Sequence, residues 1–524
     1  MLDLLIINGT VYDGTGADGT RRDVGVLDGK IVFPEMSRPP EARQVIDASE
    51  LAVSPGFIDV HTHADEQIYG EPSRKSKLLQ GNTTEIAGQC SFSRAPYLDD
   101  APFDSEETRL KIALSPTFRS WAEYKEDMAS RRIGTNLLSF VGHRSVRASA
   151  MGMADRAPAP RELDLMKSLV AECMEEGAPG LSTGLVYAPS CYGTEDELVE
   201  LLKVVGRYGG MYTTHVRGEA DTVTEALSEA LRIAERAEVP VNISHIKAMF
   251  PQNYQKMDEM LEMIDRANSR GMSVTTDAYP YDATSSPATS ALPPSFLAKG
   301  IPALSDFLGT KEGVDALRRA VTHPTEIWEN PIANIGARNF IIADAAVTKE
   351  AMGKRVSEYA EMKGLDDIEA FADLYSRNRC AMTDVRFNML EENVEKAYRH
   401  PTCLVGSDGL YNGSGLAHPR AFATFPRYLG RFIREKKVLT LAEGIHRLTG
   451  KAAERYRLKD RGLIKEGYVA DITVFDPETV CDTATYSDPF APNAGIRYVI
   501  VGGKLRAHDG ELVGEENGTF LSWK

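Results

Sequence analysis

The sequence predicts an α/β fold built on a (β/α)₈ barrel of the TIM type, and three observations lead to it. The middle of the 524-residue chain alternates strand-like and helix-like stretches, as the βαβ units of a parallel sheet do. Polar side chains follow several apparent strands at intervals of roughly 30 residues, the length of one βα unit. Both ends of the chain instead carry short, alternating apolar runs broken by glycine, aspartate and proline, which is typical of small β-strands.

Polar positions mark the carboxyl ends of the predicted barrel strands. A (β/α)₈ barrel collects its functional side chains at that end, so the same positions are candidates for the site. The last interval is much longer than one unit, and we interpret the extra chain as an insertion beside the barrel mouth over 284–348. Both VTTDAY and DVRFNM could supply the seventh strand. The marked positions are His61 with His63, Cys90, His143, Thr183, His215, His245, Asp277 and Asp408.

The two β-rich ends are expected to combine into one small sheet domain. Runs such as LLIINGTVYDG occur near the start, and IRYVIVGGKLRAHDG occurs near the end. The predicted organisation is therefore a sheet domain from residues 1–55 and 460–524 and a barrel over 56–459. The insertion over 284–348 interrupts the barrel and could serve as a lid, because long loops are often functional.

Composition disfavours several classes of protein. Lys and Arg number 60 against 76 Asp and Glu, and the resulting net charge of −16 disfavours nucleic acid and anionic membranes as partners. No run of about 18 apolar residues occurs, so no membrane-spanning helix is expected. The first residues lack the basic and apolar regions of an export signal, and six scattered cysteines are typical of reduced thiols. We therefore expect a cytoplasmic protein.

His61 and His63 end the strand-like run PGFIDVHTH. Alternation along a strand puts Asp59 and both histidines on one face, where two imidazoles can bind a metal ion. The alternative is a pair of hydrogen-bonded strand histidines. His215 in TTHVRGE and His245 in ISHIKA lie at neighbouring strand ends, which is the arrangement that a shared ion needs. We therefore interpret all four histidines as metal ligands.

Cys90 and Asp408 each allow more than one interpretation. Cys90, in EIAGQCSFS, could be a small buried apolar side chain, or a thiolate that completes one zinc site or joins two. Asp408, in a Gly-Ser-Asp-Gly turn, could be a metal ligand, a general base or a turn residue. Because histidines already supply the candidate ligands, the general base is favoured for Asp408.

Together these motifs resemble the amidohydrolase superfamily, and within it the N-acyl-D-amino-acid deacylases, also called D-aminoacylases. The likeness covers nearly the whole chain and includes GLSTGLVYAPSCY, TDAYPYDATSS, HPRAFATFPRYLG and DRGLIKEGYVADITVFDP. It implies a metal-dependent hydrolase on a (β/α)₈ barrel with an appended β-sandwich. It also implies a small-molecule substrate, an N-acyl-D-amino acid, whose linear amide bond is cleaved to a carboxylate and the free D-amino acid.

The resemblance assigns roles to the metal-site residues. It makes Cys90, His215 and His245 the ligands of a tightly held zinc ion. It makes His61 and His63, with Cys90 again, a second and weaker site. Many members of the superfamily bridge two metals with a carboxylated lysine on the fourth strand, but that strand, APGLSTGLVY, contains no lysine here.

The resemblance also implies the residues that act on the substrate. Asp408 matches the catalytic acid/base, which takes a proton from a metal-activated water and passes it to the leaving amine. Arg420, in AHPRAF, matches an arginine that can bind the substrate α-carboxylate with two hydrogen bonds. The other implied positions near the substrate are Lys247, Tyr187, Tyr281 and His143.

Departures from the family pattern bear on the substrate side chain. The chain reads Gln-Cys-Ser-Phe around Cys90, where the family has Asn-Cys-Gly, and Ser-Ser-Pro at 285–287, where Gly-Ser-Thr is common. Arg94 and Arg144 replace an apolar and a small residue, and two added arginines would suit an acidic side chain such as D-Glu or D-Asp. Two alternatives stay open: hydrolysis of another amide (a cyclic amide, dipeptide or carbamoyl substrate), and a metal-binding barrel without catalysis.

Overall fold

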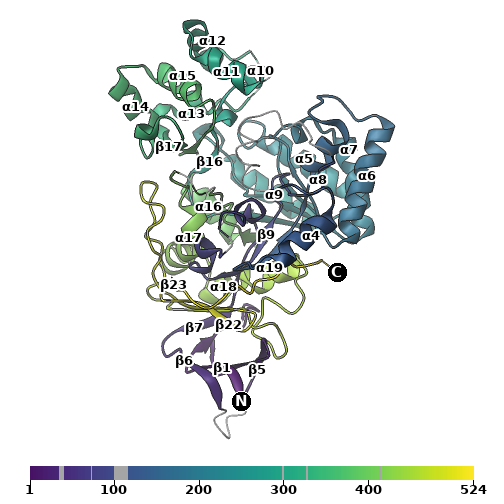
Figure 1. The fold of residues 1–524 in the computed structure, drawn as a ribbon, viewed down its shortest axis with the longest axis vertical. Helices are drawn as coiled ribbons and strands as arrows, with labels where there is room; N and C mark the ends of the chain where they lie inside the picture. Colours follow the sequence, from purple (N-terminus) through teal and green to yellow (C-terminus); the bar gives the residue numbers. More distant parts are fainter. Residues whose placement is uncertain are drawn as a thin grey trace.

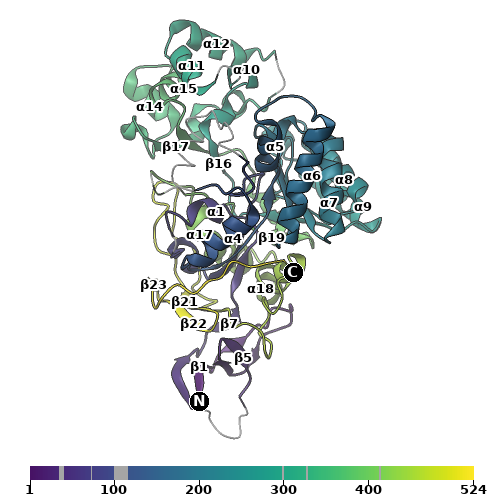
Figure 2. The same cartoon turned by 45° about the vertical axis from the view of Figure 1, so that its right-hand side comes forward.

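The protein is described from a computed structural model covering residues 1–34, 41–71, 73–98, 116–297, 300–325, 328–411, 413 and 415–523. Figures 1 and 2 show three parts along the long axis: a layer of helices at one end, a barrel in the middle, and sheets that contain the N-terminus at the other end. Residues 298–299 and 326–327 of the predicted insertion lie outside the described residues. None of the helices in the described ranges is long and apolar enough to cross a bilayer.

Parallel strands form the barrel. The first three pair in the order β8-β9-β10, and the rest pair in the order β11-β12-β13-β14-β15-β19. β11 continues the line of β10 after Phe140, so within the described residues the barrel has eight strand positions. Their bounds are β8 (Phe57–Asp59), β9 (Asn82–Ala87), β10 (Asn136–Ser139), β11 (Val141–Gly142), β12 (Gly180–Gly184), β13 (Met211–His215), β14 (Val241–Ile243), β15 (Val274–Ala278) and β19 (Cys403–Val405).

The barrel closes between its first and last strands. The N–H of Val60, just after β8, donates to the carbonyl of Val405 at 3.4 Å, and Thr62 forms a parallel bridge to Gly409. The predicted (β/α)₈ barrel is thus confirmed, and VTTDAY, as β15, supplies its seventh strand. DVRFNM instead contributes to β18 (Met382–Arg386), which lies in an antiparallel sheet outside the barrel.

Amphipathic helices cover the barrel. α8 shows the pattern: Val223, Leu227 and Ala234 lie on one buried face, while polar residues occupy the other. α7 begins at Thr194, whose side chain accepts from the N–H of Glu197 as an N-cap. The helices around the barrel are α1 (Ala64–Gln67), α2 (Lys75–Leu78), α4 (Trp121–Ser130), α5 (His143–Met151), α6 (Pro160–Glu175), α7 (Glu195–Arg207), α8 (Val223–Ala237), α9 (Lys256–Ser269), α16 (Glu391–Arg399), α17 (Arg420–Arg427), α18 (Leu441–Leu448) and α19 (Gly450–Arg455).

The insertion layer follows β15 and has its own core. Its sheet pairs in the order β16-β18-β17, and its helices pack around Leu304, Phe340 and Tyr375. The layer continues past residue 348, the predicted end of the insertion, because later helices and β18 pack on the same core. Its elements are β16 (Thr284–Pro287), α10 (Pro294–Leu297), α11 (Ile301–Leu308), α12 (Lys311–Thr322), α13 (Pro331–Ile335), β17 (Phe340–Ala345), α14 (Val356–Lys363), α15 (Asp367–Arg377) and β18.

Two sheets at the far end combine both ends of the chain. One pairs in the order β5-β4-β1-β6 and the other in the order β23-β22-β21-β20-β7-β2-β3. Side chains of both sheets, including Leu4, Val53 and Ile472, pack into one core between them, as in a sandwich. The strands are β1 (Leu2–Ile7), β2 (Thr10–Val11), β3 (Thr20–Arg21), β4 (Val24–Leu27), β5 (Lys30–Val32), β6 (Ala42–Asp47), β7 (Ala52–Pro55), β20 (Ile472–Phe475), β21 (Ile496–Val501), β22 (Lys504–His508) and β23 (Glu511–Leu512).

The last described residues leave these sheets and run along the barrel. The N–H of Leu521 donates to the carbonyl of Leu137 at 2.7 Å, and that of Trp523 to Gly177 at 2.9 Å. These hydrogen bonds place the segment on the surface of the barrel. The division of the chain at residues 55 and 460 stays a prediction.

Candidate metal centre and active site

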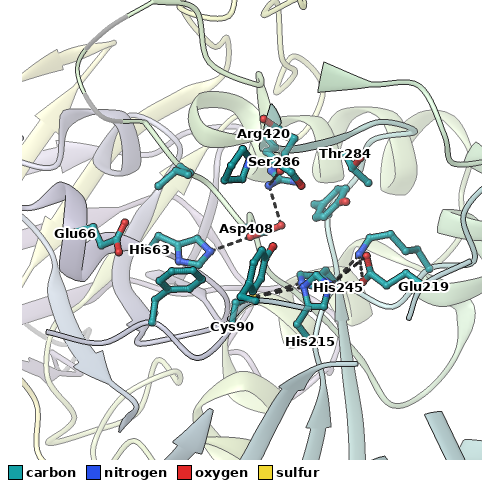
Figure 3. Close-up of a pocket in the computed structure, with 17 residues that line it drawn as sticks. His63, Glu66, Cys90, His215, Glu219, His245, Thr284, Ser286, Asp408 and Arg420 are labelled. Carbon is teal, nitrogen blue, oxygen red and sulfur yellow. Dashed lines mark hydrogen bonds and ion pairs between the residues drawn. The ribbon is translucent and has the colours of Figure 1, made fainter. Parts of the chain in front are cut away.

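A cavity opens at the carboxyl ends of the barrel strands, beneath β16 of the insertion layer (Figure 3). Most of the predicted site residues line it, and so do Glu66, Phe92, Glu219 and Tyr279. The side chains converge from separate strand ends, as the spacing of the sequence predicted for a barrel. The predicted residues that line the cavity are His63, Cys90, Tyr187, His215, His245, Lys247, Asp408 and Arg420.

Cys90, His215 and His245 form one cluster of potential ligand atoms. Cys90 Sγ lies 3.5 Å from His245 Nε2 and 4.0 Å from His215 Nδ1, and all three atoms fall within 4.8 Å of one another. One thiolate and two imidazoles are donors that zinc prefers, and three protein ligands leave a position for water or substrate. The donor set therefore fits a zinc ion.

A second cluster shares Cys90 and adds His61, His63 and Asp408. His61 Nε2 lies 3.4 Å from Cys90 Sγ and 3.6 Å from Asp408 Oδ1, and His63 Nε2 lies 3.2 Å from the same oxygen. These ligand atoms also fall within 4.8 Å of one another. His61 is fully buried beneath the cavity, whereas His63 lines it.

Three of these residues have an uncommon backbone conformation. Cys90 follows β9 with a φ of 53°, His245 follows β14 with a φ of 36°, and Asp408 follows β19 with a φ of 46°. Non-glycine residues rarely adopt positive φ, and such positions gather at functional sites, where surrounding contacts hold them. For Asp408 one such contact is its own N–H, which donates to the carbonyl of His61 at 2.8 Å.

Two carboxylates lie beside the Nδ1 atoms of His245 and His61, on the side of each ring that faces away from Cys90. Glu219 Oε1 lies 3.1 Å from His245 Nδ1, and Asp277 Oδ1 lies 3.2 Å from His61 Nδ1. Both rings therefore turn Nε2 toward Cys90. Metal-ligating histidines usually have a carboxylate or carbonyl beside the ring nitrogen that does not bind the metal.

Glu219 is a functional candidate that sequence reasoning missed. Its Oε1 lies 2.5 Å from Lys247 Nζ, and its Oε2 lies 3.6 Å from His215 Nε2. Burial alone would raise the pKa of this carboxyl, but His215 and Lys247 hold the pKa well below its usual range. The one signal in the sequence is its place four residues after His215, in TTHVRGE.

The charges of the site favour an ionised thiol and an ionised carboxyl. Burial alone would raise the pKa of the Cys90 thiol, but His61 and His245 hold this pKa well below its usual range. Burial would also raise the pKa of Asp408, yet Arg420, whose Nη2 lies 2.8 Å from Asp408 Oδ2, holds it well below its usual range. A thiolate binds metal and a carboxylate accepts a proton, so both groups are in their reactive forms.

Basic and aromatic side chains form part of the cavity wall. Arg420 Nη2 also donates to the carbonyl of Ser285 at 3.3 Å, and its guanidinium lies 4.6 Å from the centre of the Tyr279 ring. Lys247 Nζ lies 2.8 Å from His245 Nδ1. The Tyr187 ring packs at 5.3 Å from the ring of His215.

Tyr281 does not line the cavity, although it was predicted to lie near the substrate. Its ring packs edge-on against His418 at 5.0 Å, and the Arg427 guanidinium lies 4.7 Å from its centre. Tyr279, two residues earlier, faces the cavity instead. The chain turns at Pro280, so the alternation of the strand does not extend to Tyr281.

His143 also lies outside the cavity lining. It is fully buried, with Nδ1 at 2.8 Å from Ser190 Oγ and Nε2 at 2.9 Å from Glu197 Oε1. Ser190 belongs to the turn that follows Tyr187. The structure thus places His143 under the segment that carries Tyr187, without a surface toward the substrate.

Arg94 and Arg144 lie one layer behind the cavity wall. Arg94 Nη1 is 3.6 Å from Glu66 Oε1, and the guanidinium of Arg144 lies 4.9 Å from the centre of the Phe92 ring. Glu66 and Phe92 line the cavity, whereas neither arginine is among its lining residues. The geometry therefore gives no support to direct recognition of an acidic substrate side chain by these two arginines.

Comparison with known proteins gives one family and full-length relatives. The model of the amidohydrolase family matches residues 44–507. The N-acyl-D-glutamate deacylase of Alcaligenes xylosoxydans xylosoxydans is 34% identical over 506 residues, which are 96% of this chain and 93% of that protein. The D-aminoacylase of the same organism is 32% identical over 523 residues, 99% of this chain and 97% of that protein.

A solved structure resembles the whole fold. It is the N-acyl-D-glutamate deacylase of Bordetella bronchiseptica, complexed with zinc and a phosphonate inhibitor that mimics the tetrahedral intermediate of its reaction. It superimposes with a TM-score of 0.84 at 32% identity and covers 99% of both chains.

Proposed function

The chain belongs to the amidohydrolase family, and from this premise we propose that it hydrolyses the amide bond of N-acyl-D-amino acids to a carboxylate and a free D-amino acid. One observation carries the proposal: the ligand cluster of Cys90, His215 and His245 shares a cavity with the ionised carboxylate of Asp408. A metal-binding barrel without catalysis would not require a general base at that place.

Zinc is the metal that we propose for this site. Cys90, His215 and His245 would hold it tightly, and His61 and His63, with Cys90, would form a weaker second site. When bound, zinc supplies Lewis acidity, which lowers the pKa of a water molecule toward neutrality and polarises an amide carbonyl.

Asp408 would act first as the general base and then as the general acid. Its carboxylate accepts a proton from the attacking water, whose oxygen bonds to the carbonyl carbon. The C–N bond then breaks, and Asp408 passes the proton to the leaving nitrogen, so that the amine departs neutral. Arg420 keeps Asp408 ionised before the reaction, because its positive charge favours the carboxylate.

Basic and aromatic side chains would orient the substrate. A D-amino acid carries an α-carboxylate, and Arg420 and Lys247 present the cations that such a group needs. Tyr187 and Tyr279 form walls beside them, with Tyr279 in the place that the sequence analysis gave to Tyr281. His143 would support the Tyr187 segment through Ser190 and would not touch the substrate.

The names of the relatives refer to two ranges of substrate side chain. Two of them, at 34% and 32%, carry names that refer to D-glutamate and to D-amino acids in general. Among the lining residues, Lys247 already pairs with Glu219, and Arg420 pairs with Asp408. An acidic preference thus remains a prediction. Replacement of Arg94 and Arg144 by Ala tests it, because hydrolysis of acidic substrates should fall more than hydrolysis of apolar substrates.

We also propose a cytoplasmic location, small molecules as the partners of the cavity, and no role for nucleic acid. The six cysteines are all free, as expected in a reducing compartment. The negative net charge supports the exclusion of nucleic acid.

Release of amine from matched N-acetyl-D- and N-acetyl-L-amino acids tests the proposal. Zinc-loaded protein is incubated with N-acetyl-glutamate and N-acetyl-leucine of each hand, and free amine is measured. We expect hydrolysis of the D substrates alone, and the glutamate-to-leucine ratio reports the side-chain preference. If no D substrate is hydrolysed while zinc is bound, the protein acts on a different kind of amide bond. Hydrolysis of the L series would contradict the assigned chirality of the substrate.

A further inference from the structure

A second cavity lies at the end of the barrel opposite the active site. It forms where β13, β14 and β15 begin, and α19 and the segment ending at Trp523 cover it. Figure 1 shows the C-terminal end of the chain beside α19, away from the insertion layer. The strands are parallel, so this cavity is separated from the proposed zinc site by the length of a strand, roughly 15 Å.

The charged side chains that line this cavity are mainly basic. It includes Lys451, Arg455 and Arg457, against the single carboxylate of Glu454 among its lining residues. The whole chain has a net charge of −16, so a concave surface with this excess of cations is not what its composition alone would produce.

The three cations are bound to neutral groups. Arg455 Nη2 donates to the carbonyl of Val241 at 2.5 Å, Arg457 Nη1 donates to that of Gly209 at 3.0 Å, and Lys451 donates to the carbonyl of Pro401. Within the part of the chain that the structure describes, none of the recorded ion pairs joins any of the three to a carboxylate. Among those described residues, no carboxylate therefore neutralises their positive charge.

Bringing these cations together has a cost, because burial and neighbouring cations disfavour their charged forms. Burial, together with the charge of Arg447, lowers the pKa of Lys451 to about 8. Burial, together with the charge of Arg457, lowers the pKa of Arg455 to about 10. The buried Nε of Arg455 makes no hydrogen bond within the described residues. A bound anion among these groups would favour their charged forms and so offset the cost of bringing the cations together.

We propose that this cavity binds a small polyvalent oxyanion such as phosphate. Lys451 and Arg457 would contact it from α19 and from the turn that follows this helix, and Arg455 would contribute its charge from behind while it holds the start of β14. The guanidinium of Arg457 lies 5.3 Å from the centre of the Trp523 ring, which fixes one side of the site. Charge-assisted hydrogen bonds from two or three cations favour a polyvalent anion over a monovalent one.

Calorimetric titration of the zinc-loaded, full-length protein with inorganic phosphate tests this site. We expect saturable binding that weakens about tenfold in Arg457→Gln and in Lys451→Gln, because each loses one charge-assisted contact. Glu454→Gln should bind phosphate more tightly, since it removes the opposing charge. Arg318→Gln is the control: its guanidinium pairs with Asp366 in the insertion layer, so the same change in net charge should leave the affinity unchanged.

Three outcomes would overturn the proposal. Equal affinity in the wild type, Arg457→Gln and Lys451→Gln would mean that phosphate binds elsewhere, for instance at the metal centre. Acetate binding as tightly as phosphate would contradict a polyvalent site. A Glu454→Gln variant with weaker binding would contradict the assigned charges. Arg455 is left unchanged in these tests, because its hydrogen bonds hold the backbone at the start of β14.

Discussion

At the scale of single residues, Asp408 has the most constrained surroundings in the cavity. Its backbone is left-handed, its N–H is bound to the carbonyl of His61, and its two oxygens face His63 and Arg420. Each contact fixes either its position or its charge. A turn aspartate without a further role would not need a buried arginine beside it, because an exposed carboxylate is ionised at neutral pH without help.

We predict that Asp408→Asn abolishes turnover and keeps the tight metal. Asparagine has nearly the same shape but cannot accept a proton, so kcat should fall about 100- to 10,000-fold. Cys90, His215 and His245 are unchanged, so one zinc ion per chain should remain. Amine release and metal analysis of the purified variant measure both quantities. Retained turnover would remove Asp408 from the reaction, and loss of the zinc would make it a ligand instead.

The residues that sequence analysis could place are those fixed by the strand ends. His215 is the last residue of β13, and Cys90 and His245 lie just beyond the ends of β9 and β14, so the barrel pattern alone predicted their convergence. Glu219 lies in the loop after β13, and Tyr279 begins the turn after β15, so the direction of both side chains depends on the path of the chain beyond the strand. The same reason explains why Tyr281 was placed at the cavity and is found beside His418.

At the scale of elements, the insertion layer reaches the groups that support the metal site. Glu329, in the segment before α13, accepts a hydrogen bond from the N–H of Glu219 at 2.7 Å. Glu219 in turn contacts Lys247 and His245. The layer therefore touches the barrel at a residue that orients a proposed metal ligand.

Glu329 gives this contact a pH dependence. Burial, with the negative charge of Glu219, raises the pKa of Glu329 to about 7. The native state thus binds the proton more tightly than the unfolded chain, so the stabilising contribution is full below about pH 4.5 and is lost as the pH rises through 7. We predict that Glu329→Gln, which keeps the hydrogen-bond acceptor, is more stable than the wild type at pH 8 by about 2 kcal/mol.

Unfolding by denaturant at pH 5 and pH 8 measures this effect. The gap between Glu329→Gln and the wild type should widen from the lower to the higher pH. The matched change Glu350→Gln, at an exposed carboxylate paired with Lys363 in the same layer, should show no such widening. A constant gap between the pH values would mean that Glu329 is ionised throughout.

Two elements illustrate why the path of the chain could not be settled from its sequence. β15 and β18 are both short strands with mixed polar and apolar residues and the same burial pattern, so each fitted the seventh barrel strand. β15 pairs in parallel with β14 and β19, whereas β18 pairs antiparallel with β16 and β17. Only the strands with which they pair distinguish β15 from β18. Because those strands are distant in the sequence, the local sequence does not indicate the pairing.

At the scale of the whole molecule, the tight metal site would join distant parts of the barrel. Its candidate ligands follow β9, β13 and β14, which lie in both of the paired strand groups of the barrel. A ligand that binds only the folded state stabilises it by mass action, by about 4 kcal/mol at a concentration 1,000 times its dissociation constant.

We therefore predict that chelation lowers the melting temperature by a few degrees and that added zinc restores it. Thermal unfolding with and without chelator measures the shift. Cys90→Ser, which removes the shared thiolate, should melt at nearly the same temperature under both conditions. A chelator-independent melting temperature in the wild type, with zinc shown to be removed, would mean that the metal contributes nothing to the fold.

The pairing of β7 with β20 has a consequence for the time course of folding. β7 ends at Pro55 and its neighbour β20 begins at Ile472, so most of the chain separates two adjacent strands. Contacts this distant in sequence form late, because the intervening loop must first be closed. During synthesis the edge of β7 stays unpaired until the ribosome has released β20. The nascent chain therefore carries an open, aggregation-prone strand edge while the barrel is being synthesised, and the sandwich is completed only after β20 has emerged.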